Sequence, residues 1–252
     1  MTKRTCRAFA LSLTLLAVGL TTTAQSIETG DDVIARLREN VQAIEDLDAV
    51  IVVETYADGA VDLTQRLRLS VLQPNRMRQE YLAPDYLAGN LTLIVGDAMW
   101  IYIAAADTWF QEDLSELSSA EQPWLVFRQY LRDVEDEFGD YDFVLEAVDA
   151  EAFHLVGTPT TDDATYGRIE LRVDPATFVP TRRVLYDVDG NLLVDLHILE
   201  VEEVADGTYL ARLMETYDED GVLASVIRYE ELVVDGGLDP ALFEHSEEAA
   251  GE

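Results

Sequence analysis

From residue 49 onward, apolar side chains recur at every second position, in short runs separated by turn-forming residues. In the run 60–72, Leu67, Leu69 and Val71 fall on one face of an extended chain, because successive side chains of a strand point to opposite sides. Polar and basic residues occupy the other face. Several turns contain an Asp-Gly pair, which tolerates the positive φ angles of tight hairpins: Asp58-Gly59, Asp189-Gly190, Asp206-Gly207 and Asp220-Gly221. The pattern predicts antiparallel β-structure.

About eleven such runs follow one another, so we expect one long antiparallel meander. So many strands do not form a flat sheet. We therefore expect the sheet to curl strongly, with a concave inner face and a solvent-exposed outer face. No linker rich in proline or serine interrupts the pattern. Residues 25–245 are therefore predicted to form a single domain, followed by an acidic tail at 246–252.

Two segments have helical rather than strand spacing. In residues 29–48, Thr29 or Asp31 is a candidate cap, and apolar residues recur at three- and four-residue intervals from Val33 to Ile44. Residues 121–138 have Pro123 near the start and a stripe formed by Trp124, Phe127 and Leu131. We expect both helices to pack against the concave face of the sheet.

The run from Met99 to Ala105 does not alternate between apolar and polar residues. Met99 and Ile101 would point one way, and Trp100 and Tyr102 the other. An antiparallel strand with one solvated face would alternate. Both faces of this strand must therefore be covered, either by a helix alone or by a helix together with a bound apolar ligand.

Residues 1–24 have the pattern of a secretory signal peptide. Lys3, Arg4 and Arg7 precede an apolar run, 8–20, and Ala24 closes a small-residue cleavage site. A retained membrane anchor is less favoured, because the apolar run is shorter than the roughly 20 residues that span a bilayer. The only cysteine lies in this segment, so the exported chain would have no thiol and no disulfide. We predict a soluble periplasmic protein.

The chain is strongly acidic, with 17 basic and 50 acidic residues and a formal net charge of −33. Removing the three basic residues of the signal leaves 14, all arginine, and a charge of −36. Nucleic acid is excluded as a partner on this ground, since phosphate backbones require a positive surface. Catalytic motifs are also lacking. The sequence has no G-x-S-x-G elbow, no Gly-rich phosphate loop and no H-E-x-x-H, and the exported chain has no lysine.

Weaker chemical signals have simpler explanations. His197 would share a strand face with Asp195, but no nucleophile accompanies them, so an exposed strand histidine is favoured. His154 is expected to be structural, and His245 to lie in the tail. The stretches 187–191 and 218–221 resemble fragments of calcium loops, but strands flank both and hairpin turns are favoured. We predict no enzyme activity, no metal and no cofactor.

Two quoted stretches resemble the LolA-like periplasmic lipoprotein-carrier superfamily: "VLQPNRMRQEYLAPDY" and "LTLIVGDAMWIYIAAADTWFQEDL". This chain and the members of that superfamily share a Pro-Asn turn, a strand rich in aromatic and basic residues, and a turn leading to a W-x-Y strand. The first helix and the closing "LDPALF" fit as well, so the resemblance spans 34–243. It implies a mostly β fold of the α+β class: an incomplete antiparallel β-barrel of about eleven strands, closed by helices over an apolar cavity.

The resemblance also implies residues that line this cavity. Met77 stands where the family often has a phenylalanine at the entrance, while Trp100 and Tyr102 match the W-x-Y strand. Ordinary core packing is the alternative for all of the candidate cavity residues, which are Met77, Tyr81, Trp100, Tyr102, Trp109, Phe110, Trp124 and Phe127. Two positions depart from the family pattern, Gln73 where the best-defined subgroup has arginine, and Gln79 where tryptophan is usual.

The function implied is that of an exported, non-enzymatic carrier that moves acyl chains of lipoproteins or lipids between membranes. Its partners would be the acylated cargo and membrane-bound donor and acceptor proteins, and we expect a monomer. The two departures leave room for an alternative, an envelope sensor or regulatory binding module of the same fold. A sensor would bind cargo without delivering it.

The charge leads to a test of salt dependence. A dense carboxylate surface is typical of salt-adapted proteins, whereas an acidic proteome without a salt requirement is the alternative. Under the first hypothesis, circular dichroism should show the β signal rising as NaCl is added, because salt screens the repulsion among carboxylates. Full folding at very low salt would contradict it.

Overall fold

The computed structural model describes residues 27, 29–114, 138–162, 164 and 166–245. The predicted signal peptide and acidic tail lie outside these residues, as does the predicted second helix except for Phe138. The one α-helix in the described part of the chain is α1, Gly30–Gln42. None of the described helices is long and apolar enough to cross a membrane.

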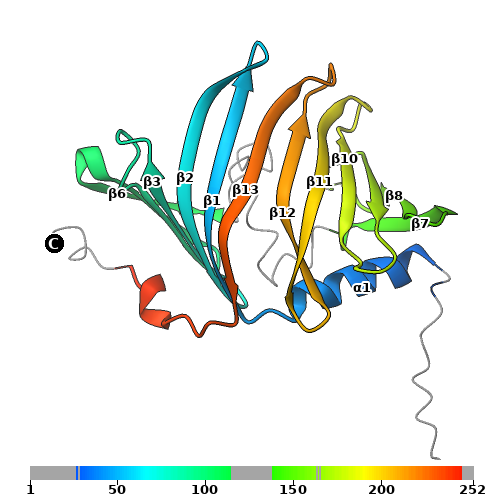
Figure 1. The fold of residues 1–252 in the computed structure, drawn as a ribbon, viewed down its shortest axis with the longest axis horizontal. Coiled ribbons are helices and arrows are strands. Elements are labelled where there is room, and N and C mark those ends of the chain that lie inside the picture. Colours follow the sequence, from blue (N-terminus) through cyan, green and yellow to red (C-terminus); the bar gives the residue numbers. More distant parts are fainter. Residues whose placement is uncertain (1–26, 28, 115–137, 163, 165, 246–252) are drawn as a thin grey trace, which may run out of the picture.

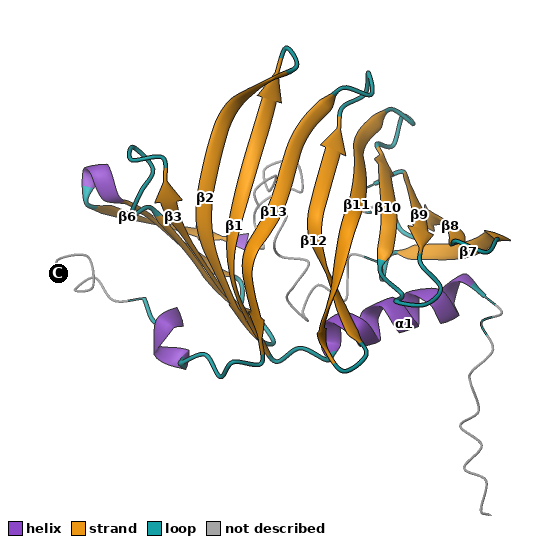
Figure 2. Ribbon diagram, viewed as in Figure 1, coloured by secondary structure: helices purple, strands orange, loops and turns teal. Residues whose placement is uncertain are grey.

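Thirteen antiparallel strands form one curved sheet (Figures 1 and 2). The first six are β1 Asp46–Ala57, β2 Ala60–Leu72, β3 Arg76–Ala83, β4 Leu91–Val95, β5 Ala98–Ile103 and β6 Thr108–Asp113. The other seven are β7 Tyr141–Val148, β8 Phe153–Pro159, β9 Arg168–Val173, β10 Pro180–Tyr186, β11 Leu192–Ala205, β12 Thr208–Tyr217 and β13 Leu223–Val234. Strands β6 and β7 are the two edges, so the sheet is not closed.

The strand order corrects the predicted single meander. Two meanders, β1 to β6 and β7 to β13, are joined by the pairing of β1 with β13 at the centre of the sheet. Consecutive strands β6 and β7 therefore lie at opposite edges. The error has a physical cause: hairpins are specified by local turns, whereas no local signal marks a pairing between Leu47 and Val234.

The predicted count of about eleven strands is also wrong, because the described sheet has thirteen. The strand predicted to run from Met99 to Ala105 is found, but it ends earlier than expected. Strand β5 stops at Ile103, and a short 3-10 helix, η1 (Ala104–Ala106), reverses the chain into β6. Asp107 has a left-handed φ of 48° and its N–H donates to the carbonyl of Ala104. The alanines thus form a turn, a role that their apolar character does not indicate.

The concave face of the sheet carries the core. Register places Ile51, Leu67 and Tyr229 side by side on this face, and all three are buried. At the other half of the sheet α1 packs Val33, Ile34 and Leu37 against buried residues of β7 to β10. Of the two predicted cap candidates, Thr29 rather than Asp31 caps α1, since its hydroxyl accepts from the N–H of Asp32 and its own N–H donates to the Asp32 carboxylate.

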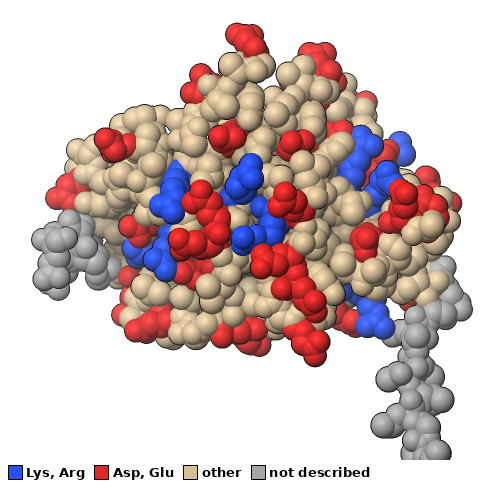
Figure 3. All heavy atoms as spheres, in the orientation of Figure 1, with Lys and Arg blue, Asp and Glu red and all other residues tan. Residues whose placement is uncertain are grey.

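The convex face is charged. Arginines form ion pairs with acids there, both across strands, as Arg66 of β2 does with Glu230 of β13, and within one strand, as Arg78 does with Glu80 in β3. Figure 3 shows both signs gathered over the central strands on the face toward the viewer. This separation follows from the period of two, which sends arginines of β2 to one face and its leucines to the other.

The C-terminal segment, Leu238–His245, covers the convex face of β3 and β4 and reaches Trp100 of β5. It contains a short 3-10 helix, η6 (Pro240–Phe243), which packs on β3 and β4 and buries Phe243. His245 stacks on Trp100, with ring centroids 5.3 Å apart. In the described part of the chain, His245 covers the second face of β5 at Trp100, whereas the second helix expected over the sheet lies outside the described residues.

Two aspartates join the start of β1 to the end of β13. The buried Asp46 carboxylate accepts from the N–H groups of Gly236 and Gly237 at 2.9 Å and of Leu238 at 3.3 Å. In return Asp235 Oδ1 accepts from the N–H of Glu45 at 2.7 Å. The C-terminal segment therefore leaves the centre of the sheet in a fixed direction.

Replacing Asp46 by asparagine should destabilise the protein. The amide group presents only one oxygen to three N–H donors, and an unsatisfied buried donor costs about 1–3 kcal/mol. Urea denaturation should show a lower midpoint with an unchanged slope. Asp58→Asn, in the exposed β1–β2 turn, is the matched control and should change little. Equal midpoints for the two variants would show that the Asp46 bonds add no stability.

Candidate functional site

Half-buried apolar side chains line the concave face beside the fully buried core. Val53, Ile101, Leu196 and Ile198 belong to this group, and each packs against the buried cluster that contains Ile51. They come from β1, β5 and β11, on both sides of the centre of the sheet. We call these four residues the concave apolar wall. They leave apolar surface available to a ligand, which fully buried core residues do not.

Three of the predicted cavity residues lie on the concave face. Met77 pairs with Val71 and Ile94 and has 0% exposure, so it is core in this structure. Tyr81 lies opposite Leu67 and is half-buried, and this burial raises the pKa of its hydroxyl. Phe110 lies opposite Ile101 on edge strand β6 and is 52% exposed.

Three others lie on the convex face. Trp100, Tyr102 and Trp109 share a face, because Tyr102 pairs with Trp109 and Trp100 is two residues away in β5. The rings of Tyr102 and Trp109 are 5.1 Å apart. The structure thus brings together two groups on opposite faces rather than one. Trp124 and Phe127 lie outside the described residues.

His245, which the sequence analysis placed in the tail, completes the convex aromatic group. Its ring stacks on Trp100 and meets the edge of Trp109 at 4.7 Å. Within the described part of the chain, Nε2 of His245 and Nε1 of Trp109 are buried without a hydrogen-bond partner. Ring packing rather than hydrogen bonding therefore holds this contact. An aromatic residue shortly after "LDPALF" was the available sequence signal.

The other two histidines meet carboxylates. His197 Nε2 lies 3.0 Å from Asp195, which agrees with the predicted shared face. Arg182 donates two hydrogen bonds to the same carboxylate, at 2.8 and 2.7 Å. These bonds hold the pKa of Asp195 below its usual value. The carboxylate is thus committed to an arginine, and this environment suits a structural ion pair better than the orientation of a catalytic imidazole.

The two acidic loops are hairpin turns, as predicted. Asp187 accepts from the N–H groups of Asp189 and Asn191, and Asp218 from those of Asp220 and Val222. Both carboxylates are therefore turned onto their own loops. Among the described residues, no group of three or more histidine, cysteine, aspartate or glutamate side chains is arranged to hold a metal ion.

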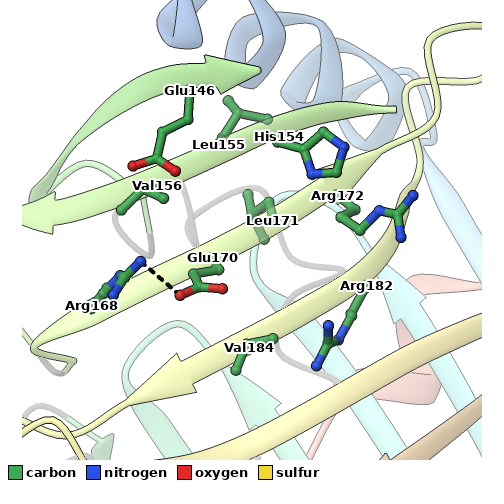
Figure 4. A pocket seen from close by; sticks show the side chains of 10 residues that line it. All are labelled: Glu146, His154, Leu155, Val156, Arg168, Glu170, Leu171, Arg172, Arg182 and Val184. Carbon is green, nitrogen blue, oxygen red and sulfur yellow. Dashed lines mark ion pairs between the residues drawn. The ribbon is translucent and has the colours of Figure 1, made fainter. Parts of the chain in front are cut away.

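A groove of about 270 Å³ lies on the convex face over β8, β9 and β10, with α1 on the far side of the sheet (Figure 4). Arginines and carboxylates dominate its walls. Its one ion pair between lining residues joins Arg168 to Glu170 at 2.8 Å. The lining residues are Glu146, His154, Leu155, Val156, Arg168, Glu170, Leu171, Arg172, Arg182 and Val184.

Solved structures share this architecture. A DUF1329 family protein from Desulfovibrio piger is 23% identical with a TM-score of 0.69, over 86% of this chain and 96% of that one. A LolA superfamily protein from Nitrosomonas europaea is 17% identical, with a TM-score of 0.65 over 87% and 99% of the two chains. A domain from Vibrio parahaemolyticus assigned to outer membrane lipoprotein sorting is 17% identical, with a TM-score of 0.64 over 85% and 95%.

These likenesses define the class: the chain has the LolA-like fold, which confirms the resemblance seen in the sequence at the level of fold. A family model described as "Uncharacterized protein" matches residues 75–247, more than half of the chain, and the chain belongs to that family. No curated protein matches it in sequence.

Phe243 should anchor the C-terminal segment to the convex face. Phe243→Ala removes a buried ring, a change worth about 3–5 kcal/mol, and the segment should open before the sheet does. We expect faster protease cleavage around residues 236–245 with an unchanged β signal in circular dichroism. Leu242→Ala, at the more exposed neighbouring position, is the control. Equal cleavage rates for both variants would mean that Phe243 is not the anchor.

Proposed function

We propose that this protein is an exported, non-enzymatic carrier that binds acyl chains of lipoproteins or lipids and transfers them between membranes. The observation that carries the proposal is the concave apolar wall of an unclosed, curved sheet. The LolA-like fold supports it, and one structure of that fold comes from a domain assigned to lipoprotein sorting. Tyr81 and Phe110 flank the wall and would extend the apolar surface offered to a chain.

The physical requirements of a carrier fit this wall. Burying an acyl chain gains about 0.8 kcal/mol per CH₂, so no catalytic residue and no cofactor is needed to hold it. Ordered strands supply the wall, and a pre-formed wall lowers the entropic cost of binding. Release requires a membrane or acceptor protein that competes for the chain. The acidic surface would keep the loaded carrier away from anionic membranes until such an acceptor is met.

The cellular setting belongs to the same proposal. Residues 1–24 would act as a cleaved signal peptide, and the domain would work as a monomer in the periplasm. Its partners would be an acylated lipoprotein or lipid and membrane-bound donor and acceptor proteins. Native mass spectrometry of protein purified without detergent, followed by organic extraction, would identify the class of cargo that copurifies.

Neighbouring valines of β1 offer a matched pair of variants. Val53 belongs to the concave apolar wall, whereas Val52 points to the convex face between Arg66 and Arg228, and both are half-buried. Val53→Glu places a charge where the chain would lie, and we expect binding of a fluorescent fatty acid to weaken by about tenfold or more. Val52→Glu should bind as the unmodified protein does.

Two results would contradict the proposal. The first is equal binding by both variants, with the folded β signal intact. The second is the absence of any bound lipid, both after purification and after incubation with lipid vesicles and a lipoprotein. Transfer of a labelled lipoprotein between two vesicle populations then distinguishes a carrier from a sensor, because a sensor binds cargo without delivering it.

A further inference from the structure

Four basic or protonatable side chains form a row across adjacent strands on the convex face. His154 of β8 lies directly opposite Arg172 of β9, Arg172 opposite Arg182 of β10, and Arg182 opposite His197 of β11. Directly opposed residues share a face and lie about 5 Å apart. The first three of these residues line the convex groove.

Three of the four members of the row, His154, Arg182 and His197, have carboxylate partners. His154 Nε2 lies 2.8 Å from Asp149, whose pKa falls to about 2 because of this bond and two backbone N–H donors. Asp195 serves both Arg182 and His197. The carboxylates nearest the row are thus already saturated by donors.

Arg172 is the exception. Its guanidinium makes no hydrogen bond and no ion pair with any residue that the structure describes, and its Nε is buried without a partner. Burial of an unsatisfied donor is unfavourable, and like charges directly opposed across a sheet are destabilising. The chain has 50 acidic residues and 17 basic ones, so an arginine without an acidic partner is not what this composition leads one to expect. A bound anion would remove both penalties.

We propose that Arg172, with Arg182 and His154, binds a phosphate group in the convex groove. The planar guanidinium of Arg172 presents an unpaired fork of N–H donors that matches phosphate oxygens, and Arg182, whose Nε and Nη2 bind Asp195, has further N–H donors for the same anion. Figure 4 shows both guanidinium groups at the same end of the groove, with the His154 ring beside Arg172. A carboxylate has only two oxygens in one plane and would engage one fork.

The other charges in the groove define its polarity. Arg168 and Glu170 neutralise one another at the opposite end, and Glu146 lies at that end too (Figure 4). Asp149 and Asp195 lie beside the row, but they are bonded to His154 and to Arg182 and His197, so no described carboxylate is paired with Arg172. The groove volume of about 270 Å³ has room for a phosphate ester as well as for the free ion. The inference goes beyond the carrier proposal and does not depend on it, because it uses the opposite face of the sheet.

The first test is calorimetric titration of the folded protein with inorganic phosphate at constant ionic strength. Arg172→Gln should weaken binding about tenfold or more, because it removes the one unpaired fork. Arg172→Lys keeps the charge without the fork and should bind with intermediate affinity. Arg66→Gln, which removes an equal charge from an ion pair elsewhere on the convex face, is the matched control and should bind as the unmodified protein does.

The source of the phosphate group is distinguished by a second titration. Tighter binding of soluble dihexanoyl phosphatidic acid than of inorganic phosphate would indicate a lipid headgroup, and equal affinities would indicate the free ion. Val53→Glu should leave both titrations unchanged, so failure of the carrier proposal and failure of this one are distinguishable.

Three outcomes would overturn the proposal. They are no phosphate binding, equal weakening by Arg172→Gln and Arg66→Gln, and preference for poly-glutamate over phosphate. The second would reveal diffuse electrostatics rather than a site. The third would identify an acidic polypeptide as the ligand of the row.

Discussion

The pairing of β1 with β13 is the contact on which the rest of the structure depends. It runs from Leu47 opposite Val234 to Thr55 opposite Ser225, and it joins two meanders that are each hairpin-connected. Without it, each meander would expose a long edge carrying buried apolar residues such as Ile51 and Tyr229. With it, those two edges pair at the centre, and among the described strands only β6 and β7 remain as edges.

This pairing also determines where the two ends of the described chain go. The segment before β1 and the segment after β13 leave the sheet from the same place, where the N–H of Asp46 donates to the Asp235 carboxylate and the N–H of Asp235 donates to the Asp46 carbonyl. From there α1 runs under the concave face toward β7, and η6 lies on the convex face of β3 and β4 (Figure 1). Each terminal element thus covers one half of the sheet, on opposite faces.

The sequence allowed the local features to be predicted and left the long-range ones open. Alternation in β2, the Asp-Gly turns and the Thr29 cap are decided by neighbouring residues, and each is found as predicted. The number of strands predicted the curl of the sheet, and the LolA-like resemblance added that the sheet is not closed. Residue spacing could not reveal that β1 pairs with β13 or that His245 covers Trp100, because both contacts join residues far apart in the chain.

The candidate sites show the same division. Tyr81 and Phe110 were found by their residue type and do lie beside the concave apolar wall, whereas Trp100 and Trp109 have the same composition signal but face the other way. A hydrophobic run predicts apolar surface, but it does not indicate which of its side chains lie on the concave face and which on the convex face. The row from His154 to His197 was missed for a different reason. It exists only through the register of three successive hairpins, and a slip of one residue in any of them would break it.

The period of two also explains how one thin sheet can serve two chemistries. Leu171 and Arg172 are neighbours in β9, yet the leucine is buried against the α1 side and the arginine faces the convex groove. The concave apolar wall lies on β1, β5 and β11, whereas the convex groove lies over β8 to β10, whose concave side is packed against α1. Because the ladder fixes both side chains at once, each face of the sheet keeps its own chemistry. The sheet therefore keeps the two proposed sites apart, which is why a substitution in the concave apolar wall should leave the convex groove unchanged.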